Sequence, residues 1–236
     1  MTDKIKPSAE FVTLLDPNSI ASEAYKTLRT NISLRSFDSE IKTINVISST
    51  AAESKSTTAI NLGYVYSQLK KNVLVIDMDL RKPTLHKKLE IKNKLGIIDI
   101  ATNRCKFEDA VIHYAPHYDV LPAGSKTPFA SEFIQSSSFK RFIEACKKQY
   151  DMVIIDCPPI NLVSDGIILS TYTDGTILCV GSGKVEKKEL QRAKDQLSQF
   201  DVNILGIVMT RMPLEKKGYG YGYGYGYYSD DSKKKK

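Results

Sequence analysis

The sequence predicts a doubly wound α/β fold built around a mostly parallel sheet, and three observations lead to this prediction. Short apolar runs alternate with helical segments along the chain. These runs are continuous stretches of Val, Ile and Leu, as expected of parallel strands whose two faces are both buried. The chain has 236 residues, 42% of them hydrophobic, which is enough to fill one sizeable core. A repeated β–α order places ligands at the carboxyl ends of the strands.

Each element has a local justification. The first is a helix over residues 18–36, where Ser19 or Ser22 can cap the amino end and Ile20, Ala24, Leu28 and Ile32 recur at helical spacing. Six apolar runs predict strands: "TINVISS", "NVLVIDMD", "YDVLPAG", "YDMVIIDCPP", "GTILCVGS" and "NILGIVMTR". Between them we expect helices near residues 56–70, 107–113, 137–149, 164–172 and 185–199.

The chain divides into a folded domain, residues 1–212, and a tail, residues 213–236. After Pro213 the sequence reads "LEKKGYGYGYGYGYYSDDSKKKK", in which glycine alternates with tyrosine before acids and lysines. Such a segment has no apolar face to bury, so we expect it to be disordered.

Composition excludes several classes of protein. The net charge of +7 permits an anionic partner, but no basic helix or aromatic-interleaved patch predicts nucleic-acid binding. The four cysteines form no C-x-x-C pair, and the three histidines are not grouped with acids. No apolar run approaches the roughly 20 residues that span a bilayer, and the first residues lack the apolar core of a signal peptide. We therefore expect a cytoplasmic protein.

The segment "INVISSTAAESKSTTAINLG", residues 44–63, has the layout of a phosphate-binding P-loop. In such a loop Lys55 reaches the β- and γ-phosphates and the Ser56 hydroxyl binds Mg²⁺, while backbone N–H groups at the helix start face the phosphates. Thr57 could hold the α-phosphate. The loop has no glycine, and a positive φ at Ser54 would cost about 1–2 kcal/mol. The loop alone supports a phosphate site and an ordinary surface lysine equally.

Three carboxylates favour the phosphate site. "NVLVIDMDLRKP" ends a buried strand with Asp77 and Asp79 on the same side, and "YDMVIIDCPP" ends another strand with Asp156. Acids at the carboxyl edge of a parallel sheet, beside a lysine and a hydroxyl, suit Mg²⁺, which prefers oxygen ligands. The sequence therefore predicts a P-loop NTPase-like protein that binds a nucleotide together with Mg²⁺.

These three segments resemble the Walker A, Walker A′ and Walker B segments of the bacterial protein-tyrosine kinases, or BY-kinases, of capsular and exopolysaccharide synthesis. The likeness covers nearly the whole chain. "SEAYKTLRTNI" resembles the E-x-x-R-x-x-R segment of that family, and "AGSKTPFASEFIQSSSFKRFI" resembles its G-x-x-P-P-N-P-x-E-L segment. The tyrosine-rich end resembles its autophosphorylation cluster.

The resemblance implies a kinase that transfers the γ-phosphoryl group of ATP to tyrosine. At the matching positions it implies phosphate binding by Ser54, Lys55, Ser56 and Thr57, and Mg²⁺ binding by Ser56, Asp79 and Asp156. It implies that Asp77 orients or deprotonates the tyrosine hydroxyl, with Lys55 and Asp79 also catalytic. Arg211 stands where relatives often carry a lysine near the adenine. The implied phosphoacceptors are Tyr219, Tyr221, Tyr223, Tyr225, Tyr227 and Tyr228.

The same resemblance implies partners. Glu23, Lys26 and Arg29 fall on one helix face, where the family's pattern implies contacts that form a homo-oligomeric ring. The family also implies a separate transmembrane polysaccharide co-polymerase, or chain-length regulator, as activator, recruitment to the inner face of the membrane, and a cognate tyrosine phosphatase.

Three alternatives stay open. One is a plain nucleotide-binding module, which would bind ATP without any phosphoryl transfer. Ser54 in place of glycine, and "TPFASEF" in place of P-P-N-P, are compatible with a pseudokinase scaffold that turns over poorly. Partition and septum-positioning ATPases share the fold and the paired aspartates. They typically carry an extra lysine in a K-G-G sequence, where this loop reads Ser48-Ser49-Thr50-Ala51.

Overall fold

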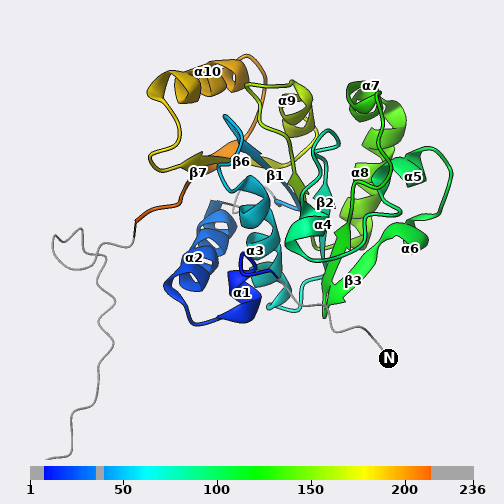
Figure 1. Ribbon diagram of the computed structural model, residues 1–236, viewed down its shortest axis with the longest axis horizontal. Coiled ribbons are helices and arrows are strands. Elements are labelled where there is room, and N and C mark those ends of the chain that lie inside the picture. Colours follow the sequence, from blue (N-terminus) through cyan, green and yellow to red (C-terminus); the bar gives the residue numbers. More distant parts are fainter. Residues whose placement is uncertain (1–7, 36–39, 214–236) are drawn as a thin grey trace, which may run out of the picture.

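The computed structural model describes residues 8–35 and 40–213 as one seven-stranded sheet between two layers of helices (Figure 1). The strand order is β3-β4-β2-β5-β1-β6-β7, and β3 alone is antiparallel to its neighbour. The strands are β1 (Thr43–Ser48), β2 (Val73–Asp77), β3 (Ile112–Ala115), β4 (Tyr118–Leu121), β5 (Met152–Asp156), β6 (Gly175–Gly181) and β7 (Ile204–Thr210).

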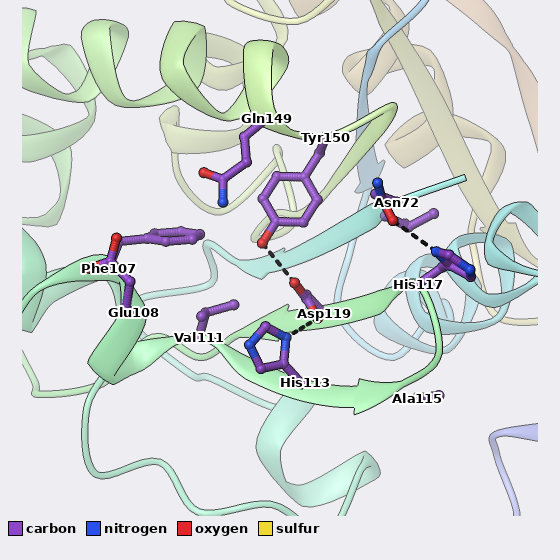
Figure 2. Close-up of a pocket in the computed structure, with 11 residues that line it drawn as sticks. Asn72, Phe107, Glu108, Val111, His113, Ala115, His117, Asp119, Gln149 and Tyr150 are labelled. Carbon is purple, nitrogen blue, oxygen red and sulfur yellow. Dashed lines mark hydrogen bonds and ion pairs between the residues drawn. The ribbon is translucent and has the colours of Figure 1, made fainter. Parts of the chain in front are cut away.

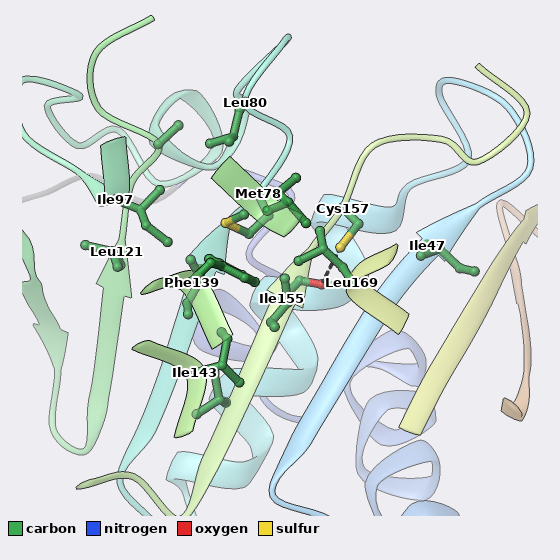
Figure 3. Close-up of a cluster of buried hydrophobic side chains, with 14 of the residues drawn as sticks. Ile47, Met78, Leu80, Ile97, Leu121, Phe139, Ile143, Ile155, Cys157 and Leu169 are labelled. Carbon is green, nitrogen blue, oxygen red and sulfur yellow. Dashed lines mark hydrogen bonds between the residues drawn. The ribbon is translucent and has the colours of Figure 1, made fainter. Parts of the chain in front are cut away.

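The helices divide between the two faces of the sheet. One face is covered by α1 (Val12–Leu15), α2 (Ile20–Arg35), α3 (Lys55–Ser67) and α4 (Leu85–Lys88). The other is covered by α5 (Ile97–Ala101), α6 (Phe107–Ala110), α7 (Ala130–Gln135), α8 (Ser137–Gln149), α9 (Asp165–Ser170) and α10 (Lys187–Ser198). Each face has its own apolar core. Figure 3 shows the second one, where Phe139 and Ile143 of α8 pack near Met78 and Ile155.

The predicted doubly wound fold is confirmed, and the burial of the strands explains why their sequences are so apolar. Strands β1, β2, β5 and β6 are buried at every residue. Strand β7 lies at the edge of the sheet, where Ile207 and Met209 are exposed. All six predicted strands and all six predicted helices have counterparts, with boundaries shifted by a few residues. Among the described residues, no helix is both long and apolar enough to cross a bilayer.

The prediction of a helix over residues 107–113 is wrong at its carboxyl end. Helix α6 ends at Ala110, Val111 is extended, and β3 then pairs with β4. The connection turns at His117, whose φ is +59°. Helices α1, α4, α5 and α7 were not predicted because, at four to six residues, they are too short to show a helical period.

Helix α2 begins as predicted, but only the carboxyl half of its predicted apolar face, with Leu28 and Ile32, packs against the core. The Ser19 hydroxyl accepts the N–H of Ser22 at 3.2 Å, so Ser19 is the cap. Ile32 is buried at 3% exposure, as its place in the pattern predicts, whereas Ile20 is 73% exposed. Ser22 is buried and donates its hydroxyl to Asp16 O at 2.7 Å.

Helix α3 begins at the phosphate loop and lies directly against the sheet, which it can approach closely because of Gly63. A Cβ at Gly63 would lie 2.7 Å from Val75 Cγ2 and 2.9 Å from Tyr118 Cε2. Both distances are shorter than a normal van der Waals contact between carbons, about 3.5–4.0 Å. A glycine in the middle of a helix is therefore explained here by packing.

We predict that Gly63→Ala lowers the free energy of unfolding by about 1–3 kcal/mol, because overpacking outweighs the better helix propensity of alanine. Urea denaturation checks this, with Thr30→Ala on the exposed side of α2 as the control. A Gly63→Ala protein more stable than the wild type would contradict the close packing of α3 on β2.

Candidate functional site

The carboxyl ends of three central strands meet the start of α3 at one edge of the sheet. Asp156 pairs in register with Val46 of β1 and Asp77 of β2, so both aspartates lie at the ends of neighbouring strands. A pocket of about 590 Å³ opens above them. Six of the residues predicted for the site line it: Ser54, Lys55, Ser56, Thr57, Asp79 and Arg211. Asp77 and Asp156 lie beneath, fully buried.

The Lys55 ammonium group links two of the predicted acids. Its Nζ lies 3.1 Å from Asp79 Oδ2 and 3.3 Å from Asp156 Oδ1. All three side chains are nearly inaccessible, at 9%, 8% and 0% exposure. Burial by itself lowers the pKa of Lys55, but the charges of Asp156 and Asp79 outweigh this and raise it. Lys55 is therefore a fixed positive charge at the start of α3.

Asp77 holds the segment that follows β2. Its carboxylate accepts the backbone N–H groups of Asp79 at 3.2 Å, and of Thr84 and Leu85 at 3.0 Å each. Burial raises the pKa of Asp77 to about 8, and the nearby charge of Asp156 acts in the same direction. The Thr84 hydroxyl lies 2.9 Å from that of Ser56, so this segment also contacts the phosphate loop.

The glycine-free loop has the strained backbone that its sequence implied. Ser54 has φ +61° and Ala52 has φ +64°, both in the left-handed region. The Glu53 side chain turns inward and is fully buried. It accepts the hydroxyl of Ser49 at 2.7 Å, the hydroxyl and N–H of Thr50, and the N–H of Gly181 at 3.1 Å. Internal hydrogen bonds to a carboxylate thus hold a loop that glycines usually shape.

Glu53 was not predicted as a site residue, although the sequence contains one indication of its role, namely an acidic residue inside a phosphate loop. A carboxylate within a phosphate loop would repel the ligand unless it pointed away from it. An acid at that position therefore indicates an inward-facing anchor.

The pocket mouth contains Arg211, which was predicted, together with residues that the sequence did not reveal. Arg211, at φ +56°, donates from Nε to Ser54 Oγ at 3.2 Å. The carboxylate of Glu10, from the segment before α1, accepts the Thr57 hydroxyl and pairs with Lys88. Arg81 lines the pocket and pairs with the buried Asp165. These contacts join residues that are distant in sequence, so no local motif predicts them.

The predicted oligomerisation residues lie on α2, outside this pocket. Lys26 pairs with Glu23 at 2.7 Å, and Arg29 donates to the carbonyl of Val65 at the end of α3. The predicted phosphoacceptors Tyr219, Tyr221, Tyr223, Tyr225, Tyr227 and Tyr228 lie outside the described residues, as does nearly all of the predicted tail.

The donor set fits Mg²⁺ bound together with a phosphate ligand. Asp156 Oδ2 is buried and has no hydrogen-bond partner among the described residues. The side chain of Ser56 lies close enough to the Asp156 carboxyl group to favour its charged form. Within residues 8–35 and 40–213, no group of three or more His, Cys, Asp or Glu side chains is arranged to hold a metal by itself. Mg²⁺ usually takes one or two carboxylates and completes its shell with phosphate oxygens and water.

A second hollow, of about 450 Å³, lies at the opposite edge of the sheet, near the starts of β2, β4 and β5. Figure 2 shows Asp119 between the Tyr150 hydroxyl, at 2.8 Å, and His113 Nδ1, at 2.7 Å. His117 Nδ1 bonds Asn72 at 2.9 Å. Two of the three histidines therefore lie away from the pocket that contains Lys55.

A phosphate loop, buried strand-end acids and a parallel sheet of this order define a nucleotide-binding protein of the P-loop NTPase class. Comparisons with known proteins narrow the class. Residues 41–215 match the family described as "AAA domain". The chain is 40% identical over 207 residues to the tyrosine-protein kinase YwqD of Bacillus subtilis, with 87% of each chain covered. It is 32% identical to the putative tyrosine-protein kinase CapB of Staphylococcus aureus, covering 85% of this chain and 88% of that one.

Solved structures agree. The chimerical protein CapA2B2 superimposes with a TM-score of 0.84 at 31% identity, covering 89% of this chain and 92% of that one. The kinase domain of the Escherichia coli tyrosine kinase ETK gives 0.81 at 26% identity, covering 92% and 86%. The chain therefore belongs to the bacterial tyrosine-protein kinase family. The septum site-determining protein MinD of Pyrococcus horikoshii shares the fold alone, with a TM-score of 0.59 at 22% identity, covering 71% and 69%.

We predict that Ser54→Gly raises the free energy of unfolding by up to about 1 kcal/mol, because the left-handed conformation that strains serine is open to glycine. The gain is reduced by the lost bond to Arg211 and by the greater freedom of glycine in the unfolded chain. Urea denaturation measures the change, and Ala52→Gly is the matched variant at the other strained position. A marked loss of stability in both variants would contradict the strain.

We predict that, in the absence of ligand, stability falls as pH rises from about 5 to 8. Asp77 has a folded pKa of about 8, above its unfolded value. The folded protein therefore binds more protons in this window, and stability decreases with pH. Thermal unfolding across this range should show a flatter profile for Asp77→Asn, which cannot ionise. Identical slopes for both proteins would mean that Asp77 is ionised throughout.

Proposed function

We propose that the protein is an ATP-dependent tyrosine autokinase that phosphorylates its own C-terminal cluster and thereby regulates capsular or exopolysaccharide synthesis or export. One observation carries the proposal: Lys55, at the start of α3, lies within hydrogen-bonding distance of two strand-end carboxylates, with Asp77 beside them. Phosphoryl transfer depends mainly on positioning and on neutralising charge, which such an arrangement supplies.

Each residue has a role in this proposal. Lys55 would exchange its carboxylate partners for the β- and γ-phosphates, helped by backbone N–H groups at the start of α3. Ser56, Asp79 and Asp156 would hold Mg²⁺, which, when bound, offsets charge on the phosphates. Thr57 would bind the α-phosphate, and Ser54 and Arg211 would contact the nucleotide from the pocket mouth.

Asp77 would orient the acceptor tyrosine and take its proton. A tyrosine hydroxyl, with a pKa near 10, is a poor nucleophile at neutral pH without a base. The Asp77 carboxylate is now bound by the N–H groups of Asp79, Thr84 and Leu85. The segment from Asp79 to Leu85 would therefore have to give up these bonds before a tyrosine could reach Asp77.

Regulation would depend on assembly. We propose that Glu23, Lys26 and Arg29 contribute to a homo-oligomeric ring, and that a transmembrane co-polymerase activates the kinase at the inner face of the membrane. A tyrosine phosphatase would remove the phosphoryl groups from the tail. Phosphorylation of the six tyrosines would add roughly −9 to −12 charges, which would repel tails from one another and favour release of the ring.

A catalytically weak pseudokinase scaffold is the second candidate. The observation that favours it is the strained, glycine-free loop, in which Ser54 and Ala52 occupy left-handed conformations. Such a protein would bind nucleotide and assemble but transfer phosphate poorly.

Intact-mass spectrometry distinguishes the two candidates. The purified protein is incubated with magnesium ATP, with and without the cytoplasmic segment of the co-polymerase. We expect a ladder of about 80 Da steps, one per phosphate, confined to residues 219–228 and enhanced by the activator segment. Lys55→Met should show no ladder because it removes the phosphate-binding cation.

If no ladder forms with the activator present while ATP still binds, the kinase proposal fails. ATP hydrolysis without phosphoryl transfer would then favour a switch ATPase. The absence of both hydrolysis and transfer would favour the pseudokinase scaffold.

A further inference from the structure

The segment before α1 reaches the mouth of the nucleotide pocket, where Glu10 makes two contacts. One carboxylate oxygen, Oε2, accepts the hydroxyl of Thr57 and also pairs with the ammonium group of Lys88. All three residues line the pocket. Thr57 belongs to the first turn of α3, and Lys88 is the last residue of α4. Glu10 therefore joins the phosphate-loop helix to a cation on a different element.

The backbone of this segment is firmly anchored. Phe11 is fully buried, with its ring centroid 5.2 Å from that of Tyr64 and 5.8 Å from that of Tyr118. The Asn61 amide donates to the Glu10 carbonyl at 2.8 Å and accepts the Thr13 N–H at 2.9 Å. The Glu10 side chain, in contrast, is 51% exposed. The carboxylate can therefore swing away while its backbone stays in place.

Glu10 is an anion in a place that favours anions. Burial is the largest single influence and opposes its charge, but the bonds from Lys88 and Thr57, with the charges of Lys88 and Arg211, together outweigh it and lower the pKa of Glu10. The amino end of α3 carries the positive end of a helix dipole. Three more cations, Arg81, Lys82 and Arg211, line the same pocket. The mouth thus has an excess of positive charge, as a site for a polyphosphate requires.

We propose that Glu10 is an internal competitor of the nucleotide: its carboxylate holds Thr57 and Lys88, and nucleotide phosphates displace it and take both partners. Lys88 is then a further phosphate-binding cation, kept at the pocket by Glu10 until the nucleotide arrives. This inference rests on the proposed nucleotide site. It follows from the shared hydroxyl, because Thr57 cannot donate its single proton to Glu10 and to a phosphate at the same time.

Binding of magnesium ADP, measured by isothermal titration calorimetry, tests the inference without any phosphoryl transfer. Glu10→Gln should bind ADP about 3- to 10-fold more tightly, because a negative charge leaves the pocket. Lys88→Met should bind about 3- to 10-fold more weakly, and Lys88→Arg should stay near the wild type. In the double variant, Glu10→Gln should recover part of the affinity that Lys88→Met loses.

Two controls separate charge competition from a structural role. Glu40→Gln removes an exposed carboxylate that pairs with Lys42, outside the pocket, and should leave ADP affinity unchanged. Without ADP, the melting temperatures of Glu10→Gln and Lys88→Met should stay near that of the wild type, since exposed ion pairs contribute little to stability. Magnesium dADP, which lacks the ribose 2′-hydroxyl, is titrated in parallel to test whether Glu10 binds that hydroxyl.

The outcomes are distinct. Tighter binding of both ADP and dADP by Glu10→Gln supports the inference. Weaker binding of ADP alone would identify Glu10 as a ribose ligand and overturn it. Unchanged affinity in both single variants would leave only a surface ion pair and also overturn it. If the affinities shift as expected but no mass ladder forms with ATP and the activator, the kinase proposal fails while the competition stands. Absence of any nucleotide binding by the wild type would overturn both.

Discussion

The buried ion cluster of Lys55, Asp79 and Asp156 is the interaction on which the arrangement of the site depends. Removing charges from water costs several kcal/mol for each ion, so none of the three groups would be tolerated there alone. Their proximity requires β2 and β5 to be neighbours with Asp77 and Asp156 in register. It also requires α3 to start beside the carboxyl end of β5. A parallel sheet of this strand order meets both conditions, and the positive charge of Lys55 offsets the acids that it gathers.

The phosphate loop shows how a backbone shape can be kept without its usual residues. Ser54 and Ala52 have left-handed conformations that cost about 1–2 kcal/mol each for a residue with a Cβ. Glu53, between them, accepts hydrogen bonds from Ser49, Thr50 and Gly181, which tie the loop to itself and to β6. A buried carboxylate that accepts several donors is strongly held, because leaving those donors unpaired would be costly. The strain and its restraint therefore lie in adjacent residues.

Most of the fold could be predicted because its signals are local. The apolar runs and the acids at positions 77, 79 and 156 mark buried parallel strands and their carboxyl ends, and Lys55-Ser56 marks the start of a helix. Strand β3 was missed because its identity depends on pairing with β4 and not on its own short sequence. Glu10 was missed because it reaches the site only through the folding of a segment that carries no motif, and Thr84 because it lies one residue beyond the motif that ends at Pro83. The apolar pattern also did not predict which side chains are exposed. Ile20 is exposed because helical spacing does not determine which apolar residue contacts the rest of the domain.

The packing of α1 and α2 shows that the part of the chain that matches the AAA-domain model is smaller than the unit that folds. The family match begins at residue 41, yet Phe11 and Ile32, both before that boundary, are buried in the core that α3 shares with the sheet. A chain trimmed to the matched residues would leave that side of α3 facing water and would also lose Glu10 from the pocket. The matched domain and the folding unit therefore have different boundaries, and helices α1 and α2 belong to the folded domain although they precede the residues that match the family model.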